Sequence, residues 1–251
     1  MKKFFFYVVF VTLMFFNCRS ALASVQTDIE QANKVGKTVF LVVTEPGNKE
    51  TTQALDIARG AQKLAPETEV LEMNRLDVAN SLFVATNRLS EAPVPLIVVI
   101  ATNGVLAGGL PAAKANPESL VKMIPSPGKA EVVKALGAGK AVFVIASRAT
   151  MGDRLKVVEI CKNASKELKD KAVSVAIDMD DKKETSFLQQ LRVDTKYQAT
   201  AIFVINAQGQ LTGNFAGPVE VAELTKAATA KGGGCCPGSS NKKNCAIPVK
   251  K

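Results

Sequence analysis

The chain has 251 residues, of which 47% are hydrophobic, and its formal net charge is +9. It contains no histidine, which excludes Ser-His-Asp and Cys-His catalysis, imidazole zinc sites and histidine pH switches. Because only two tyrosines and no tryptophan accompany the basic residues, the sequence lacks the basic, aromatic-rich patch typical of nucleic-acid-binding proteins. We therefore expect no nucleic-acid partner.

The first 23 residues predict a cleaved signal peptide. A basic start, Lys2-Lys3, precedes an apolar run over residues 4–16, and Ala21-Leu22-Ala23 supplies small residues at positions −3 and −1 of a cut after Ala23. The apolar run is shorter than the roughly 20 residues that span a bilayer as a helix. The sequence thus predicts a periplasmic or secreted protein. A lipid anchor on Cys18 is disfavoured, because the residues before it are bulky.

Removal of the signal peptide changes the charge distribution. Without Lys2, Lys3 and Arg19, 29 basic residues remain against 23 acidic ones, a net charge of +6. The segment from Lys231 to Lys251 holds five of these lysines and no acidic residue. The rest of the mature chain is therefore nearly neutral, and the basic tail predicts at most a weak contact with an anionic membrane surface.

Two stretches about a hundred residues apart resemble each other and indicate two domains. Residues 36–43 are echoed by residues 139–146, an offset of 103, and residues 96–104 are echoed by residues 201–209, an offset of 105. The pattern in each copy predicts helix, buried strand, helix, strand, helix, hairpin and helix, which is an α/β order around a mixed sheet.

The expected elements follow in chain order. In the first copy they are helices at 25–34, 50–64 and 117–123, strands at 38–43 and 69–73, and a hairpin turning at Asn103-Gly104. In the second copy they are helices at 130–136, 153–168 and 219–230, strands at 141–146 and 172–177, and a hairpin turning at Gln208-Gly209. Within 153–168, residues Leu155, Val158, Cys161 and Leu168 recur at helical spacing.

The domain limits follow from composition. The turn-rich segment 124–128 joins the copies, so we expect domain 1 at 24–126 and domain 2 at 127–230. Residues 231–251 have no apolar period and read as a flexible tail rich in Gly, Lys and Cys.

The order of elements resembles the thioredoxin fold over nearly all of residues 25–230. In that family a cis-proline precedes the third strand, and Pro95 occupies the matching position before residues 96–100. Thioredoxins also carry Cys-x-x-Cys between the first strand and its helix, where the helix N-terminus lowers the thiol pKa. Here that position holds residues 44–49 in one copy and 147–152 in the other, and neither contains a cysteine.

The resemblance implies two redox-inactive domains that serve as a binding scaffold. The second copy departs further, since Ala199-Thr200 stands where the cis-proline would lie. Inactive tandem domains are similar to the non-catalytic domains of protein disulfide isomerases and to calsequestrin-like proteins, which hold peptides or partners. We therefore expect a protein or peptide client and no dithiol oxidoreductase activity of the two domains.

Four cysteines remain in the mature chain, and they fall into two classes. Cys161 lies on the apolar face of its expected helix, which predicts a buried, inert thiol. Cys235, Cys236 and Cys245 lie in a tail with almost nothing to bury them. A structural disulfide from Cys245 to Cys235 or Cys236 is one interpretation, and it leaves one thiol odd.

Two alternatives give the tail chemistry. The three thiols are candidate ligands of a soft metal such as Cu(I), Zn or Hg, and the vicinal pair resembles the one with which mercuric reductases hand over their ion. Alternatively the tail exchanges disulfides, with Cys235 and Cys236 as nucleophiles and Cys245 as the resolving thiol. The acidic run 178–181 lacks the spacing of a calcium loop and predicts a solvated turn. The sequence predicts no certain cofactor.

Overall fold

The computed structural model describes residues 24–193 and 197–231. The chain divides between Ile124 and Pro125 into two compact units, called domain 1 and domain 2 here. The expected signal peptide, its cleavage site after Ala23 and the tail cysteines lie outside the described residues. Within the described part, no helix is both long enough and apolar enough to cross a membrane.

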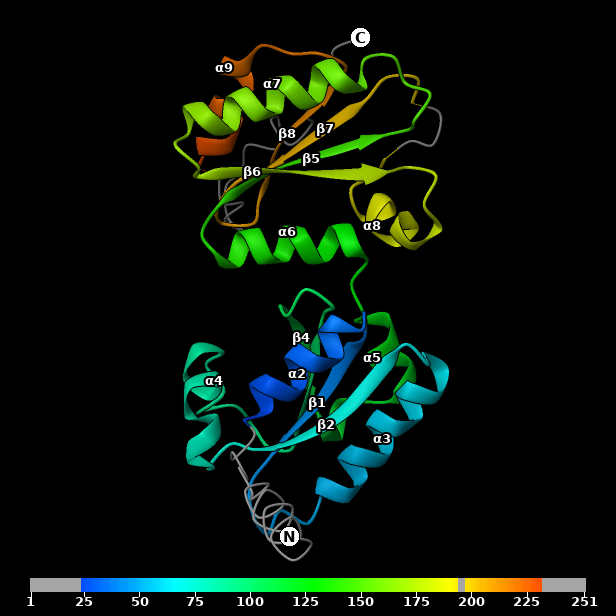
Figure 1. Cartoon of the computed structure of the whole chain (residues 1–251), viewed down its shortest axis with the longest axis vertical. Coiled ribbons are helices and arrows are strands. Elements are labelled where there is room, and N and C mark those ends of the chain that lie inside the picture. The colour runs from blue at the N-terminus through cyan, green and yellow to red at the C-terminus, as the bar shows by residue number, and fades with distance from the viewer. Residues whose placement is uncertain (1–23, 194–196, 232–251) are drawn as a thin grey trace, which may run out of the picture. The chain divides into compact units, whose positions relative to one another are not determined.

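Domain 1 contains one four-stranded sheet with helices on both faces (Figure 1). Its elements are α2 (Val25–Lys34), β1 (Thr38–Thr44), α3 (Thr51–Leu64), β2 (Thr68–Asn74), η1 (Val78–Asn80), α4 (Ser81–Thr86), β3 (Leu96–Ile100), β4 (Leu106–Pro111), η2 (Ala112–Lys114) and α5 (Pro117–Lys122). The strand order is β2-β1-β3-β4, with β1 parallel to β2 and antiparallel to β3. The last pair, β3 and β4, is an antiparallel hairpin.

Domain 2 repeats this architecture. Its elements are α6 (Pro127–Gly137), β5 (Ala141–Ser147), α7 (Arg154–Glu167), β6 (Ala172–Asp178), η3 (Lys182–Glu184), α8 (Thr185–Gln190), β7 (Ala201–Ile205), β8 (Leu211–Ala216) and α9 (Val221–Thr229). The strand order β6-β5-β7-β8 and the polarity of each pair match domain 1. This order and polarity define a thioredoxin-like fold, which confirms the fold class that the sequence predicts.

The two central strands are apolar except at their ends, where Thr38, Thr44 and Ser147 are buried polar residues. All seven residues of β1 are buried, because α2 and α4 cover one face of the sheet and α3 and α5 the other (Figure 1). Small residues let α3 approach closely: Ala54, Ala58 and Ala61 are fully buried against the sheet. In β5 the same burial holds over all seven residues, as expected for a strand covered on both faces.

One expected core position in α7 is wrong. Leu155 is 82% exposed, whereas Val157, Cys161 and Ala164 are fully buried. The buried stripe therefore follows the spacing 157, 161 and 164, and Leu155 lies off it, one residue after the helix begins. Val158 and Leu168 pack at the margin of the core as partly buried residues.

In each domain, a buried polar side chain from a distant segment caps the first helix. In domain 1, Asn80 accepts a hydrogen bond from the Val25 N–H (3.0 Å) at the start of α2. In domain 2, Glu184 stands at the equivalent position and its carboxylate accepts the Gly128 N–H (2.7 Å) and the Ser126 hydroxyl (2.6 Å) at the start of α6. Both capping side chains are buried. A long-range cap therefore ties each first helix to the segment after β2 or β6.

Candidate functional site

Thioredoxins carry their reactive cysteines in the loop after the first central strand. In domain 1 this is the loop between β1 and α3. It carries Asn48, whose amide donates to the Val94 carbonyl (3.2 Å) and whose oxygen accepts the Glu50 N–H (2.9 Å). The Val94–Pro95 peptide bond is cis, at the position that the thioredoxin resemblance assigns to it. A side-chain amide thus links this loop to the cis-proline segment, and no thiol lies in the loop.

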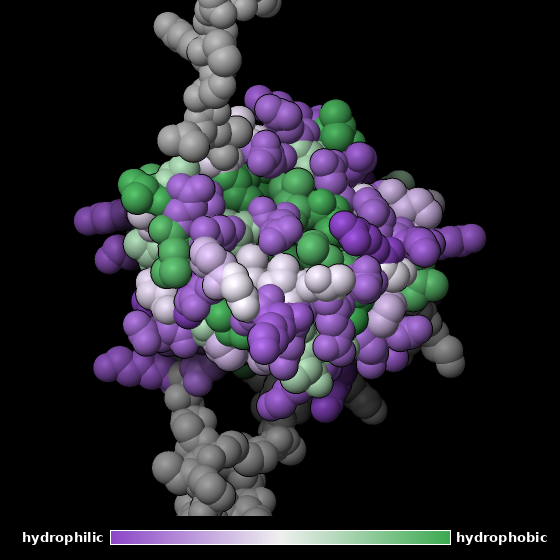
Figure 2. Space-filling model, turned by 90° about the horizontal axis from the view of Figure 1, so that it is seen from below, coloured by the Kyte–Doolittle hydropathy of each residue, from purple (hydrophilic) through white to green (hydrophobic). Residues whose placement is uncertain are grey.

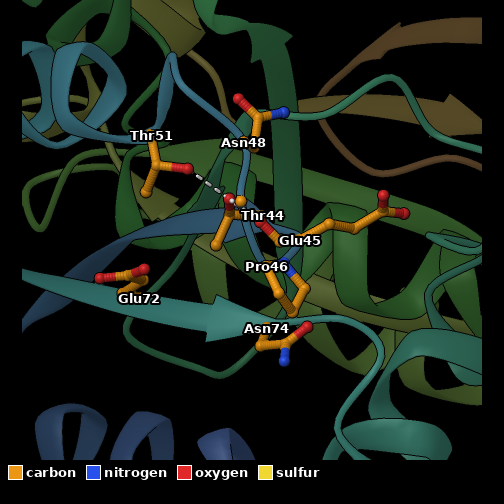
Figure 3. A pocket seen from close by; sticks show the side chains of 8 residues that line it. Thr44, Glu45, Pro46, Asn48, Thr51, Glu72 and Asn74 are labelled. Carbon is orange, nitrogen blue, oxygen red and sulfur yellow. Dashed lines mark hydrogen bonds between the residues drawn. The ribbon is translucent and has the colours of Figure 1, made fainter.

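A shallow hollow opens beside this loop, with a volume of about 240 Å³. Figure 3 shows residues of the loop after β1 on one side and residues of β2 on the other. The Thr44 and Thr51 hydroxyls form a hydrogen bond (2.5 Å) across its base. Its walls are threonine, asparagine, proline and two carboxylates, so it offers hydrogen bonds but neither a thiol nor a histidine. The lining therefore lacks the cysteines that dithiol chemistry requires.

Arg75 fastens three segments around the loop. Its guanidinium pairs with the Glu45 carboxylate and donates to the Leu89 carbonyl (3.1 Å) and the Ala92 carbonyl (2.6 Å). The Arg75 side chain is only 14% exposed. Because all these partners surround a largely buried cation, the Arg75–Glu45 pair holds the loop after β1 against the segment that leads to Pro95.

Domain 2 closes the equivalent position with different residues. Asp153 precedes α7 and accepts three contacts from Thr200, two from its N–H (3.2 and 3.0 Å) and one from its hydroxyl (2.7 Å). Thr200 is the residue found where domain 1 has its cis-proline, and it is fully buried. Hydrogen bonds between the Asp153 carboxylate and Thr200 therefore take the place of the Asn48–Val94 hydrogen bond of domain 1.

Domain 2 has an ion pair like that of domain 1 but of reversed polarity: the basic residue lies in the loop after the central strand and the acidic residue in the loop after the neighbouring parallel strand. Arg148, the counterpart of Glu45, donates to Asp180 (3.0 Å) and to the Tyr197 carbonyl (3.1 Å). In both domains an arginine thus joins the loop after the central strand, the loop after the neighbouring parallel strand and the segment before the third strand. The chain keeps this connection while changing the residues that make it.

The acidic run 178–181 behaves as the solvated turn that the sequence predicts. The Asp178 carboxylate accepts the Asp180 N–H (2.9 Å), and the Asp181 carboxylate accepts the Lys183 N–H (2.9 Å). In residues 24–193 and 197–231, no group of three or more acidic, cysteine or histidine side chains is placed to hold a metal ion.

Cys161 is the cysteine that the structure describes, and it is a buried residue in the core between α7 and the sheet. Burial raises the pKa of its thiol to about 12, so the reactive thiolate is scarce at neutral pH. This confirms the prediction of a buried thiol. Cys235, Cys236 and Cys245 lie outside the described residues, so the tail site stays a prediction.

Sequence reasoning missed an exposed apolar cluster in domain 1. Leu76, Val78 and Leu82 are 64%, 85% and 78% exposed and lie within seven positions, in the loop after β2, in η1 and in α4. Elsewhere in the described residues, large exposed apolar side chains occur singly. Figure 2 shows a face of the molecule on which hydrophobic groups lie between hydrophilic ones. We call Leu76, Val78 and Leu82 the 76–82 cluster.

The internal repeat provides a control for this cluster. Because η1 and α4 match η3 and α8 at a constant offset of 104, the counterparts of Leu76, Val78 and Leu82 are Asp180, Lys182 and Ser186, all exposed. The same positions of the same fold are therefore polar in domain 2. The fold does not require apolar side chains there, and a comparison of the two copies would have found the cluster from sequence.

No protein-family model and no curated protein matches this sequence. Solved structures similar to the chain include human ERp44 in its zinc-bound form (9% identity, TM-score 0.35), which covers 80% of this chain. The chain spans about half of that protein, 54% of its length.

Two further structures match a similar share of the chain. They are the first two thioredoxin domains of Saccharomyces cerevisiae Eps1p (9% identity, TM-score 0.32, 83% of this chain and 97% of that one) and the NTD_N/C domain of alkylhydroperoxide reductase AhpF from Enterococcus faecalis (11% identity, TM-score 0.25, 81% and 97%). Independently of these similarities, the strand order and polarity of each domain identify the chain as a tandem of two thioredoxin-like domains.

Proposed function

We propose that the protein is an exported, non-catalytic scaffold that binds apolar segments of a client polypeptide through domain 1 and carries thiols on a C-terminal arm, residues 231–251. The observation that supports client binding most strongly is the 76–82 cluster. Exposed apolar side chains that gather in one region mark interaction sites, whereas single ones do not. These three lie within seven positions of the chain. Their polar counterparts in domain 2 indicate that domain 1 keeps the cluster for binding.

The surroundings of the cluster suit an extended apolar client. A hollow of about 240 Å³ lies beside Leu82 and Phe83. This volume is below the range of about 300–1,000 Å³ that is typical of sites for whole small molecules, so the hollow has room for a single side chain. An anchor side chain in the hollow and neighbouring contacts on Leu76 and Val78 are the arrangement expected for a short peptide segment.

The chemistry of the two domains supports a binding role over catalysis. Both loops that hold the cysteines in thioredoxins contain none, and side-chain hydrogen bonds occupy them in both domains. The thiol described within the domains, Cys161, is buried and its pKa is raised. Any thiol chemistry of the native protein is therefore assigned to Cys235, Cys236 and Cys245 of the arm, either as a disulfide, as soft-metal ligands or in exchange.

Binding of an unfolded client with blocked thiols tests the proposal without interference from disulfide exchange. We expect a reduced, carboxymethylated and fluorescently labelled protein to bind in an anisotropy titration. Leu82→Ser introduces the residue found at the same position of domain 2, and loss of about 1.5 kcal/mol of apolar contact weakens binding about tenfold.

Leu155→Ser is the matched control, because Leu155 is an equally exposed leucine on domain 2. We expect this variant to bind the client like the wild type. Equal weakening by both substitutions, or no binding by the wild type, would refute the assignment of the client site to domain 1.

A further inference from the structure

The strand β6 forms an open edge of the domain 2 sheet (Figure 1). It stands at the end of the strand order β6-β5-β7-β8, and among the described strands it pairs with β5 alone. Ser174, Ala176 and Asp178 of this strand are exposed. An edge strand of this kind presents a row of backbone N–H and C=O groups to which another strand can add.

The direction of these backbone groups follows from the hydrogen bonds at the two ends of β6. The Lys171 carbonyl accepts the Ala141 N–H at the start of β5. The Met179 N–H donates to the Ser147 carbonyl at the end of β5. Because the backbone groups of successive residues in a strand point to opposite sides, the odd-numbered residues of β6 face β5. The groups that face away belong to Ala172, Ser174, Ala176 and Asp178.

The composition of this edge favours pairing with another strand. Residues 172–177 read Ala-Val-Ser-Val-Ala-Ile, a segment of high β-propensity without charge or proline. Natural edge strands are usually protected by charged side chains, by bulges or by a covering element. The equivalent strand of domain 1, β2, follows this rule, since it has Glu69 and Glu72 where β6 has Val173 and Ala176. Domain 2 has lost this protection at the same positions of the fold.

We propose that β6 pairs antiparallel with β6 of a second copy of the chain, so that two domain 2 sheets join edge to edge. The charges at the two ends of the strand favour this partner. Residues 169–171 carry two lysines and one aspartate, whereas residues 178–181 carry three aspartates. Antiparallel pairing brings the basic end of each copy beside the acidic end of the other, and a parallel arrangement would bring like charges together. The dimer goes beyond the proposed function and does not depend on it.

Symmetry and strand length select one register. A two-fold axis perpendicular to the sheet sets even-numbered residues opposite even-numbered ones, and these are the residues whose outward N–H and C=O groups are available. Pairing of Ala172 with Asp178 and of Ser174 with Ala176 uses all seven residues of β6. A register shifted by two residues would set Asp170 opposite Asp178, and like charges directly opposite each other destabilise a sheet.

A charge exchange at Ala176 tests this pairing. In the selected register the two Ala176 residues lie diagonally opposite on one face, about 7–8 Å apart. Ala176→Glu gives β6 the residue that β2 carries at the same position, and the like charges should weaken self-association at least about tenfold. Ala176→Lys should do the same. An equimolar mixture of the two variants should associate again, because each diagonal pair then has opposite charges.

Sedimentation velocity of the chain from Ser24 onwards measures the association. A reductant in the buffer prevents intermolecular disulfides of the arm. A single pair of strands buries less than about 1,200 Å², so we expect a dissociation constant of about 50 µM, within a concentration series from about 5 to about 500 µM. Ala222→Glu is the matched control, because it adds the same charge at an exposed alanine of α9 in the same domain. This variant should associate like the wild type.

Each result bears on the proposal. A wild type that stays monomeric at the highest concentration would overturn it, and so would association that persists unchanged in both Ala176 variants. A mixture of the two variants that fails to associate would also overturn the pairing of β6 with itself. Because the readout is the mass of the assembly, dimers that bind no carboxymethylated client would refute the proposed function and retain the dimer. A monomeric protein that binds the client would do the reverse.

Discussion

Replacement of Glu184 by alanine should destabilise domain 2 selectively. The buried carboxylate accepts the Gly128 N–H and the Ser126 hydroxyl at the start of α6, so its removal leaves a buried helix N–H without its acceptor. Hydrogen bonds to a charged group contribute about 1.5–3 kcal/mol each, and some of that is recovered through Ser126, which still caps α6. We expect a loss of about 3 kcal/mol, a large fraction of the 5–15 kcal/mol that is typical of a domain.

The mature chain provides a probe for this measurement. The two tyrosines are Tyr7, within the expected signal peptide, and Tyr197 in domain 2, and there is no tryptophan. Tyrosine fluorescence during urea unfolding therefore reports domain 2. Glu184→Gln keeps an acceptor for the Gly128 N–H but loses the charge, so it should cost about 1–2 kcal/mol.

The equivalent cap of domain 1 is the matched control. Asn80→Ala should leave the Tyr197 transition unchanged, because Asn80 caps α2 in the other domain. A Glu184→Ala midpoint shift worth less than about 0.5 kcal/mol, within the range of ordinary surface substitutions, would refute the reasoning. So would an equal effect of Asn80→Ala on the tyrosine signal.

Two further predictions concern Arg75 and Cys161. Arg75→Ala removes the guanidinium that joins Glu45 to the Leu89 and Ala92 carbonyls. We expect the free energy of unfolding to fall by about 2–4 kcal/mol and hydrogen exchange over residues 89–95 to become faster. Unchanged exchange there would contradict the role given to Arg75. Iodoacetamide at pH 8 should leave Cys161 unlabelled in the native protein and label it after denaturation, as read by peptide mass spectrometry, because the folded thiol has a pKa of about 12. The raised pKa also makes the free energy of unfolding depend on pH. The stabilisation from the protonated buried thiol is complete below the unfolded pKa near 9 and is lost as pH rises towards 12. The stability difference between wild type and Cys161→Ala should therefore shrink above pH 9, and a difference that grows with pH would refute the assignment.

The sequence predicts the fold well because its strongest signals are local. Continuous runs of β-branched and aromatic residues over 38–43 and 141–146 fall within fully buried strands, and the echo between the two copies predicts that both have the same order of elements, as they do. The start of α6 at Pro127 was not predicted, because the helical period begins only at Ala130. Leu155 was misjudged, since spacing alone does not fix which stripe of a helix faces the core.

The candidate site was less accessible to prediction because its contacts are long-range. Arg75 lies 30 residues from Glu45, and Glu184 lies 58 residues from Ser126, so no sequence window contains both partners. The 76–82 cluster escaped for another reason: apolar residues near a helix are taken as core, and the signal against this lies about a hundred residues away, in the polar counterparts Asp180, Lys182 and Ser186 of domain 2. The tail cysteines are the reverse case, evident in the sequence and outside the described residues.

The central claim is that domain 1 binds a client through Leu76, Val78 and Leu82, and a surface exchange between the domains tests it most directly. Leu76→Asp, Val78→Lys and Leu82→Ser give domain 1 the residues that domain 2 carries at the same positions of the fold. The triple variant should stay folded, since all three side chains are exposed and the same fold accepts these residues in domain 2. We predict that it loses binding of the carboxymethylated client by at least about a hundredfold. Client affinity equal to that of the wild type, in a variant with unchanged thermal stability, would contradict the claim.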